Sequence, residues 1–358
     1  MNKTYIIAEA GVNHNGSLDM AKKLVKVAKE AGADAVKFQT FKAENLVTKK
    51  AKQADYQVQN LGEATSQLAM LKKLELTHEE FVNLQSFCQT VQIEFLSTPF
   101  DFESADFLLD EIDITTAKIP SGELTNAPFI HCIATKRKPI ILSTGMATID
   151  EIHEALAFIA YGFARPLEPV VLEQVHSFYR TEEAKEVLKK YVTLLHCTTQ
   201  YPAPIESINL KAMIEMKKVF QLPIGLSDHS EGIHIPIAAV SMGATVVEKH
   251  FTLDKTLEGP DHVASLNPNE LKAMIKSIRE VEQALGDGIK SPTTIELQNR
   301  IPARKSLIAK KSIQAGEEFS TSNLTTKRPG DGIKPSKYWS YIGQIASKSY
   351  DEDDLIDE

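Results

Sequence analysis

The sequence is poor in three features, and each shortage excludes a class of protein. Cys88, Cys132 and Cys197 are the only cysteines, and they lack the paired spacing of a zinc knuckle or redox motif, so we expect reduced core residues. No apolar run approaches the roughly 20 residues that span a bilayer, and none at the start resembles a signal peptide. Basic charge is also scarce, because the net charge is -8, which argues against nucleic acid as a partner. We therefore expect a cytoplasmic protein that binds neither membranes nor nucleic acids.

Short apolar runs alternate with amphipathic segments up to about Gly286, a pattern typical of repeated strand-helix units around a parallel sheet. Thr77 with Glu80 and Asn267 with Glu270 resemble capping boxes that begin helices. Eight strands are expected, at Tyr5–Glu9, Ala35–Gln39, Ile93–Ser97, Thr116–Pro120, Ile140–Ser143, Val192–Cys197, Pro223–Ser227 and Thr245–His250. Eight such units predict an α/β protein with a closed (β/α)8 TIM barrel, whose active site lies where the strands end. An open doubly wound sheet is the alternative.

Other stretches interrupt the alternation of strands and helices and set the expected domain limits. The polar residues Lys42 to Leu76 are long enough to form a loop over the barrel mouth, and Tyr161 to Lys190 are expected to add a surface helix. The barrel is expected to occupy residues 1–286, followed by a linker over 287–300. Short alternating runs then predict a small, mainly β domain over 301–358.

Polar side chains gather where the expected strands end. Glu9, Lys37 and Lys118 are charged, and a charged group inside a barrel must face the open end or be paired. We expect them to point into the mouth, and a structural ion pair between Glu9 and one lysine is the alternative. Two ammonium groups with nearby hydroxyls and helix N-termini favour a phosphate dianion.

His229 and His250 end the last two expected strands, so parallel pairing would bring two imidazoles together. Two imidazoles without a thiolate leave coordination positions for water or substrate oxygens, which suits Mn²⁺, or Mg²⁺ or Co²⁺, better than a structural zinc. Such an ion would act as a Lewis acid. Taken singly, each histidine could equally be an ordinary polar residue. His14, in a glycine-flanked loop, is a weaker candidate, and His196 is expected in the core.

The strand ends and loops also carry motifs in a fixed order. They are Glu9-Ala-Gly-Val-Asn-His-Asn-Gly-Ser17, Lys37-Phe-Gln-Thr40, Ser97-Thr-Pro-Phe100, Lys118-Ile-Pro-Ser-Gly-Glu123, Ser143-Thr-Gly-Met146, Gly225-Leu-Ser-Asp-His229, Glu248-Lys-His-Phe251 and Gly259-Pro-Asp261. Together they resemble the sialic acid synthase family. In the tail, Ala303-Arg-Lys-Ser306 and Lys327-Arg-Pro-Gly330 resemble the linker and the antifreeze-like (SAF) domain of the same family.

The resemblance implies a transferase that condenses phosphoenolpyruvate with an N-acetylated mannose-type sugar, with C–O cleavage and release of phosphate. N-acetylmannosamine would give N-acetylneuraminate and 2,4-diacetamido-2,4,6-trideoxymannose would give legionaminate, and the motifs do not separate the two. Side chains near C4 and C6 of the sugar, expected in the Lys42 to Leu76 loop, would decide by donating a hydrogen bond to a hydroxyl or packing on a methyl group.

The resemblance also implies roles for single residues. A divalent metal on His229 and His250 would polarise the sugar aldehyde, and Glu9 would be the acid/base. Phosphoenolpyruvate would contact Lys37, Thr98, Lys118, Ser121 and Ser227, and the sugar would contact Gln39, Glu123, Tyr201, Asp261 and Arg328. Arg328 would come from the partner subunit of a domain-swapped homodimer. Thr199 departs from the family, in which an asparagine is frequent at this position, so no phosphoenolpyruvate contact is assigned to it.

Three other functions are the alternatives. A Schiff-base aldolase of the same barrel type would use Lys118 as nucleophile on pyruvate and would need no metal. A metal-dependent barrel hydrolase would require more His and Asp ligands than this sequence offers. A non-enzymatic carbohydrate-binding protein would bind sugar without releasing phosphate.

Overall fold

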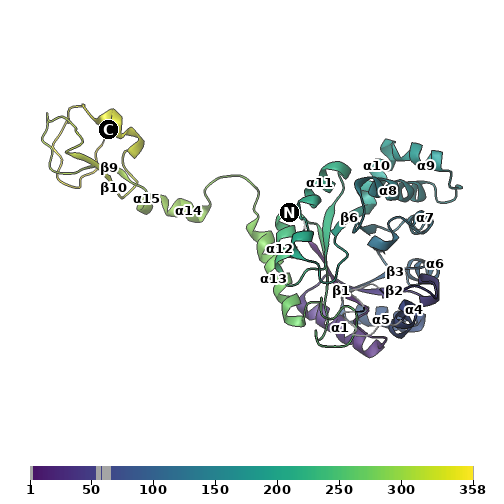
Figure 1. Ribbon diagram of the computed structural model, residues 1–358. Helices are drawn as coiled ribbons and strands as arrows, with labels where there is room; N and C mark the ends of the chain where they lie inside the picture. Colours follow the sequence, from purple (N-terminus) through teal and green to yellow (C-terminus); the bar gives the residue numbers. More distant parts are fainter. Residues whose placement is uncertain (1–2, 54–57, 59–65, 358) are drawn as a thin grey trace. The chain divides into compact units, whose positions relative to one another are not determined.

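The computed structural model describes residues 3–53, 58 and 66–357. The chain divides into two compact units, Met1–Gly286 and Asp287–Glu358. Figure 1 shows the first unit as a ring of strands surrounded by helices. Over the described part of the chain, no helix combines the length and apolar character needed to cross a membrane.

Eight parallel strands build the first unit. They are β1 (Tyr5–Gly11), β2 (Ala35–Thr40), β3 (Glu94–Pro99), β4 (Ala117–Ile119), β5 (Ile140–Ser143), β6 (Val192–Cys197), β7 (Ile224–Asp228) and β8 (Val246–His250). Backbone hydrogen bonds join them in the order β3-β2-β1-β8-β7-β6-β5-β4, and the edge strands β3 and β4 contact each other. The sheet therefore closes into a barrel. The predicted TIM barrel is confirmed, and the doubly wound alternative is wrong.

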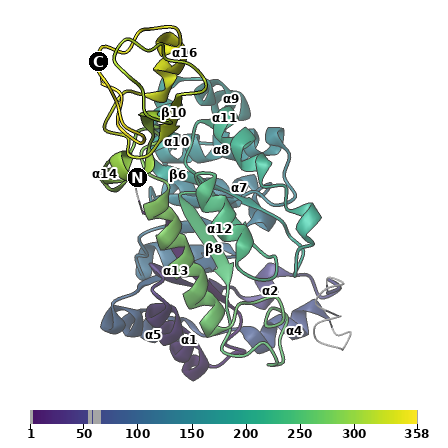
Figure 2. The same ribbon diagram turned by 90° about the vertical axis from the view of Figure 1, so that its left-hand side faces the viewer.

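Helices follow the strands, and most of them cover the outside of the barrel (Figure 2). They are α1 (Leu18–Ala31), α2 (Ala43–Leu46), α4 (Gln67–Leu74), α5 (His78–Val91), α6 (Phe102–Asp106), α7 (Ala127–Thr135), α8 (Ile149–Ala164), α9 (Leu172–Tyr179), α10 (Glu182–Tyr191), α11 (Lys211–Phe220), α12 (His234–Ser241) and α13 (Pro268–Ala284). Both predicted capping boxes are present, because Thr77 with Glu80 begins α5 and Asn267 with Glu270 begins α13.

Two insertions enlarge the barrel. The segment predicted as a loop over Lys42 to Leu76 contains α2 and α4, and its residues 54–57 and 59–65 lie outside the described residues. The surface helix predicted within Tyr161 to Lys190 is α9, and α10 follows it.

The interior of the barrel is apolar at its lower level and polar above it. One buried layer consists of Ile7, Ala35, Leu96, Ile141, Leu195 and Val246. Side chains alternate between the two faces of a strand, so the inward position above Val246 on β8 is Glu248, followed by His250. The same alternation places Glu9 above Ile7 on β1. The polar level is therefore held by the strands themselves, which are rigid elements.

The second unit has a small core of its own. The antiparallel strands β9 (Ser306–Ala309) and β10 (Leu324–Lys327) pair, and α16 (Tyr338–Tyr341) lies later in the unit. Its buried residues are Leu307, Ala309, Ile313, Phe319, Leu324, Ile333, Ala346, Tyr350 and Ile356. The stretch predicted as a plain linker contains α14 (Thr294–Gln298) and the first residue of α15 (Arg300–Ala303), which the sequence analysis missed.

Candidate active site

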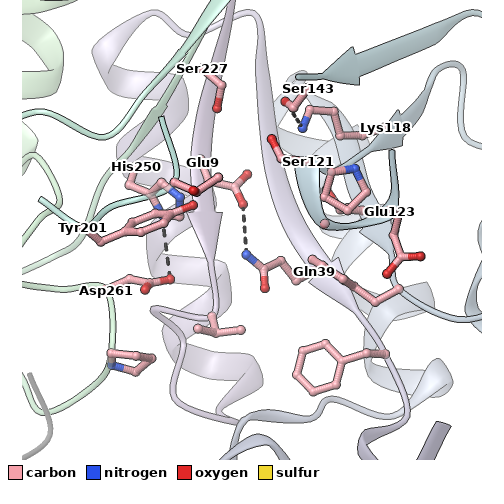
Figure 3. A pocket seen from close by; sticks show the side chains of 18 of the residues that line it. Glu9, Gln39, Lys118, Ser121, Glu123, Ser143, Tyr201, Ser227, His250 and Asp261 are labelled. Atoms are coloured by element: carbon pink, nitrogen blue, oxygen red, sulfur yellow. Dashed lines mark hydrogen bonds and ion pairs between the residues drawn. The ribbon is translucent and has the colours of Figure 1, made fainter. Parts of the chain in front are cut away.

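A cavity of about 360 Å³ lies at the carboxyl ends of the strands. It is lined by every barrel residue to which the family resemblance gave a role, namely Glu9, Lys37, Gln39, Thr98, Lys118, Ser121, Glu123, Tyr201, Ser227, His229, His250 and Asp261, whereas the weaker candidate His14 does not line it. Figure 3 shows Lys118 and Ser143 across the cavity from His250 and Asp261. Arg328 belongs to the second unit, where it is exposed directly after β10. The structure thus brings the barrel candidates together, and the roles given to them stay predictions.

Two lysines and two glutamates form a buried charge network on the floor of the cavity. Lys37 Nζ lies 2.6 Å from Glu9 Oε2 and 3.7 Å from Glu248 Oε2, and Lys118 Nζ lies 3.4 Å from Glu248 Oε1. Glu9 faced two predicted alternatives, a position in the barrel mouth and an ion pair with a lysine. Both are found, because Glu9 lines the cavity and also pairs with Lys37. Glu248 received no role from the sequence, although it lies two residues before His250 and therefore on the same face of β8.

The surroundings give the two carboxyl groups very different pKa values. Burial raises the pKa of Glu9 to about 7, against the opposing charge of Lys37. Burial acts on Glu248 in the same direction, but Lys118 and Lys37 outweigh it and hold its pKa at about 2. Burial also lowers the pKa of Lys118. Glu9 can therefore exchange a proton near neutral pH while Glu248 stays ionised, which is the division that acid/base catalysis needs.

Hydroxyl groups hold both ammonium groups in place. Lys37 Nζ donates to Thr98 Oγ1 at 2.8 Å, and Lys118 Nζ donates to Ser143 Oγ at 2.8 Å. Ser143 is a second residue to which the sequence analysis gave no role. Lys118, whose ammonium group has three N–H donors, keeps one for a ligand beyond Ser143 and Glu248, whereas Lys37 already contacts Glu9, Thr98 and Glu248. The arrangement can bind an oxyanion between the two lysines.

The loop after β5 presses against this polar level. The Gly145 N–H donates to Ser121 Oγ at 2.9 Å. A Cβ on Gly145 would lie 2.6 Å from Thr199 Cγ2 and 2.8 Å from Ser121 Oγ, so only glycine permits this approach. Thr199 lines the cavity as well, and its methyl group packs here.

The two predicted metal ligands lie side by side, with ring centroids 5.3 Å apart. His229 Nδ1 lies 2.5 Å from the Thr198 carbonyl oxygen, so in the neutral ring it carries the proton and leaves the lone pair on Nε2. His250 Nδ1 lies 3.9 Å from Asp261 Oδ2 and has no hydrogen-bond partner among the described residues. Burial lowers the pKa of His250 well below its usual value, which keeps the ring neutral, the form that binds metals.

These imidazoles do not form a closed metal site. Among residues 3–53, 58 and 66–357, no group of three or more His, Cys, Asp and Glu side chains could hold an ion. A cation bound by His229 and His250 would therefore need oxygen ligands from water or substrate. The neutral His250 ring, with its unpartnered buried nitrogen, fits such an open site, and a cation would displace a proton from His229, whose pKa Cys197 raises against the effect of burial.

Tyr201 and Asp261 flank the imidazole pair. The Tyr201 ring lies 3.9 Å from that of His229 and edge-on to that of His250 at 5.6 Å, measured between centroids. Burial raises the pKa of Asp261 to about 6. Both side chains can therefore contact a ligand held next to the histidines.

A broad part of the cavity wall is apolar. It consists of Val12, Phe41, Leu46, Val47, Met70, Leu71, Leu74 and Phe100, from the ends of β1, β2 and β3 and from α2 and α4; we call this set the apolar wall. Gln39, Gln67 and Glu123 are polar side chains that also line the cavity, and Asn126 Nδ2 donates to Glu123 Oε2 at 2.6 Å. The cavity therefore joins an anion site to a site for a larger, partly apolar ligand.

The cysteines were expected in the core, and Cys88 and Cys197 are buried whereas Cys132 is only half-buried. Cys197 also lines the cavity, with Sγ 3.8 Å from His229 Nδ1. Strand alternation explains this position, because Leu195, two residues earlier on β6, faces the barrel interior. The three cysteines are free thiols, as expected.

Comparison with known proteins identifies the family. A family model named NeuB matches residues 24–290, and a SAF domain model matches residues 304–357. The chain belongs to the NeuB family. The predicted resemblance is thereby confirmed, and with it the prediction of a transferase that condenses phosphoenolpyruvate with an amino sugar.

Relatives of this NeuB chain cover its whole length. It is 50% identical to the N,N'-diacetyllegionaminic acid synthase of Campylobacter jejuni, over 100% of both chains. It is 45% identical to the enzyme of the same name from Legionella pneumophila, over 96% of this chain and 90% of the other. A crystal structure of N-acetylneuraminic acid synthetase from Leptospira borgpetersenii, in complex with citrate, is similar with a TM-score of 0.67 and 31% identity, over 83% of this chain and 90% of the other.

Proposed function

We propose that this NeuB chain condenses phosphoenolpyruvate with 2,4-diacetamido-2,4,6-trideoxymannose to give N,N'-diacetyllegionaminate and phosphate. The apolar wall carries the proposal. This sugar has a methyl group at C6 and an acetamido group at C4, whereas N-acetylmannosamine has hydroxyls there. An apolar wall accommodates the methyl groups and leaves a buried hydroxyl without a hydrogen bond, which is costly. The two legionaminic acid synthases among the relatives support the same choice.

Phosphoenolpyruvate occupies the floor of the cavity. Its phosphate and carboxylate are anionic, and Lys37 and Lys118 supply two cations that Thr98 and Ser143 already orient. Ser121 and Ser227 add hydroxyl donors on the same level. Binding in this way holds the enol carbon about 3 to 3.5 Å from the aldehyde carbon of the sugar, the distance of a near-attack geometry.

His229 and His250 would hold a divalent cation, for which Mn²⁺ is proposed and Mg²⁺ or Co²⁺ are the alternatives. When bound, such an ion supplies a Lewis acid that polarises the aldehyde oxygen of the sugar. The neutral ring of His250 and the Nε2 atom of His229 suit this role. Tyr201 and Asp261 then lie where the sugar hydroxyls would be.

Glu9 moves the proton that the reaction needs. As the enol carbon forms a C–C bond with the aldehyde carbon, protonated Glu9 donates its proton to the developing alkoxide. Water then attacks the cationic carbon that was C2 of phosphoenolpyruvate, and ionised Glu9 takes the proton released by that water. The resulting tetrahedral intermediate loses phosphate by C–O cleavage and leaves the 2-keto acid. A pKa of about 7 lets one carboxyl group serve both steps.

The second domain completes the sugar site in a dimer. Arg328 is exposed in its own unit and belongs to the segment that matches the SAF domain. In a domain-swapped homodimer, it would reach the partner's cavity and donate hydrogen bonds to an acetamido carbonyl.

Sugar preference tests the proposal. Phosphate release is measured with saturating phosphoenolpyruvate and Mn²⁺ while either sugar is varied. Because a methyl-sized difference in an apolar pocket is worth about 10- to 200-fold, kcat/KM should be larger by that factor for the trideoxy sugar. An equal or higher kcat/KM for N-acetylmannosamine would contradict the assignment of the sugar, and activity unchanged by a chelator would contradict the metal.

A further inference from the structure

The two histidines lie one residue beyond the last paired positions of β7 and β8. The ladder between these strands pairs Ser227 with Glu248 and ends at Asp228 with Lys249. His229 and His250 follow this last pair directly. On the side where the two strands adjoin, backbone pairing between the described residues therefore stops just before the imidazoles.

A second set of contacts begins at that point, on the outer face of the barrel. Because side chains alternate along a strand, Asp228 and Lys249 point away from the cavity that His229 and His250 line. Lys249 Nζ lies 2.5 Å from Asp228 Oδ2, and the two side chains are 0% and 1% exposed. A charge pair this buried joins the two strands next to the histidines.

Ser230 extends the pair around His229. Its backbone N–H donates to Asp228 Oδ1 at 3.1 Å, and its hydroxyl donates to Asp228 Oδ2 at 2.9 Å. Lys249 Nζ also donates to the Ser230 carbonyl oxygen. The residues on both sides of His229 are thus bonded to the residue that precedes His250. We call Asp228, Ser230 and Lys249 the rim clamp.

We propose that the rim clamp is a positioning device that sets the separation of His229 and His250 and thereby the affinity of the site for a divalent cation. This inference rests on the metal in the proposed function. A buried ion pair gives little net stability, because desolvation offsets the attraction between the charges. Its charged hydrogen bonds are short and directional, so what it contributes is geometry. Partners of this kind behind metal ligands typically change affinity rather than folding.

The other backbone contacts of His229 and His250 do not fix the distance between the two histidines. His250 pairs with Glu9 on β1, and the His229 carbonyl oxygen accepts from the Ala203 N–H at 2.8 Å. Each histidine is therefore fixed to the neighbour on its far side, one toward β1 and the other toward the loop after β6. On the cavity side, Ser227 Oγ donates to Glu248 Oε1 at 3.0 Å, and the rim clamp adds the bonds that tie the two strand ends together on the outer face.

The test is a neutral double variant, Asp228→Asn with Lys249→Met, which removes both charges and leaves no unpaired one buried. Mn²⁺ binding is measured by electron paramagnetic resonance of free Mn²⁺, together with the Mn²⁺ dependence of phosphate release. The Mn²⁺ Kd should rise about 10- to 100-fold, the usual effect of disrupting groups behind metal ligands. At saturating Mn²⁺, kcat should return to nearly the wild-type value, because the clamp does not contact the substrates.

The chain offers a matched control at the other end of the barrel. Asp34 and Arg279 form an ion pair of 2.7 Å with 19% and 21% exposed side chains, and neither residue lines the cavity. The double variant Asp34→Asn with Arg279→Met should keep the wild-type Mn²⁺ Kd. Ser230→Ala, which removes one hydroxyl donor, should weaken Mn²⁺ binding in the same direction as the clamp variant but less, and it covers the case in which the double variant does not fold.

The possible outcomes distinguish a failure of the rim-clamp proposal from a failure of the proposed function. A wild-type Mn²⁺ Kd in the clamp variant, or in Ser230→Ala where the double variant does not fold, overturns the clamp alone. Equal weakening in the Asp34 and Arg279 control also overturns it, because the effect would then follow general destabilisation. A wild-type chain that binds no Mn²⁺ overturns the metal in the proposed function and the clamp with it.

Discussion

Replacing Glu9 by glutamine should make the stability of the barrel less dependent on pH. Glu9 is 2% exposed, and burial raises its pKa from an ordinary 4.5 to about 7. The folded state therefore binds a proton that the unfolded state has lost between these two values. Wild-type stability contains a penalty that is absent at low pH and grows as pH rises through this window, because the ionised group is then buried.

The size of the effect follows from the shift. One pKa unit corresponds to about 1.4 kcal/mol, so the stability of Glu9→Gln relative to wild type should rise by about 3 kcal/mol between pH 4.5 and pH 7.5. Urea unfolding at pH 5 and pH 8 measures both proteins under the same conditions. Subtracting wild type removes the titration of His250 and other groups that the two proteins share. The same variant should lose about 10²- to 10⁴-fold in kcat, because it cannot transfer a proton.

Glu248 provides a control of opposite sign. Lys118 and Lys37 hold its pKa at about 2, below the ordinary 4.5, so its charge stabilises the fold above pH 4.5 and the stabilisation disappears as pH falls through 2. Glu248→Gln should therefore be less stable than wild type by about 3 kcal/mol at neutral pH, with no change between pH 5 and pH 8. If the stability difference between Glu9→Gln and wild type is also the same at pH 5 and pH 8, the reasoning about Glu9 is refuted.

Three further predictions concern ligands. Arg328→Ala should raise the sugar KM while leaving the phosphoenolpyruvate KM near the wild-type value, and wild-type kinetics for both substrates would contradict the swapped dimer. Leu71→Gln places an amide in the apolar wall and should shift the ratio of kcat/KM values toward N-acetylmannosamine by about 10-fold or more, whereas Leu71→Met should not; an unchanged ratio would show that the wall does not select the sugar. His250→Ala should abolish measurable Mn²⁺ binding while circular dichroism stays native, and retained binding would exclude this ligand.

Much of the fold can be predicted from hydrophobic patterns that a single sequence contains. The eight buried strands are short runs of β-branched and apolar residues, and all eight lie where they were expected. Their ends shifted by a residue or two, for example from Glu9 to Gly11 in β1, because pairing with neighbours decides where a ladder ends. Local sequence does not contain that information.

The candidate site was predictable wherever a strand end carried an unusual polar residue. Glu248 and the cavity position of Cys197 escaped because neither residue was taken as a polar group at a strand end. Their positions two residues from His250 and Leu195 reveal the inward face once the alternation is applied.

The apolar wall was the hardest part to foresee. It comes partly from α2 and α4, which have four and eight residues, and helices this short give too few turns for a periodic pattern. The segment that contains them therefore reads as a polar loop. Its few apolar residues, such as Met70 and Leu74, acquire a common face only when the chain packs against Phe41.

The central claim is that this cavity joins phosphoenolpyruvate to a sugar with cleavage of the C–O bond. The most direct measurement uses phosphoenolpyruvate labelled with ¹⁸O in the bridging oxygen, with 2,4-diacetamido-2,4,6-trideoxymannose and Mn²⁺, and follows the label by mass spectrometry. The account predicts a nonulosonic acid product without the label and inorganic phosphate that contains it. A label retained in the keto acid, or a product formed equally well from pyruvate, would contradict the account.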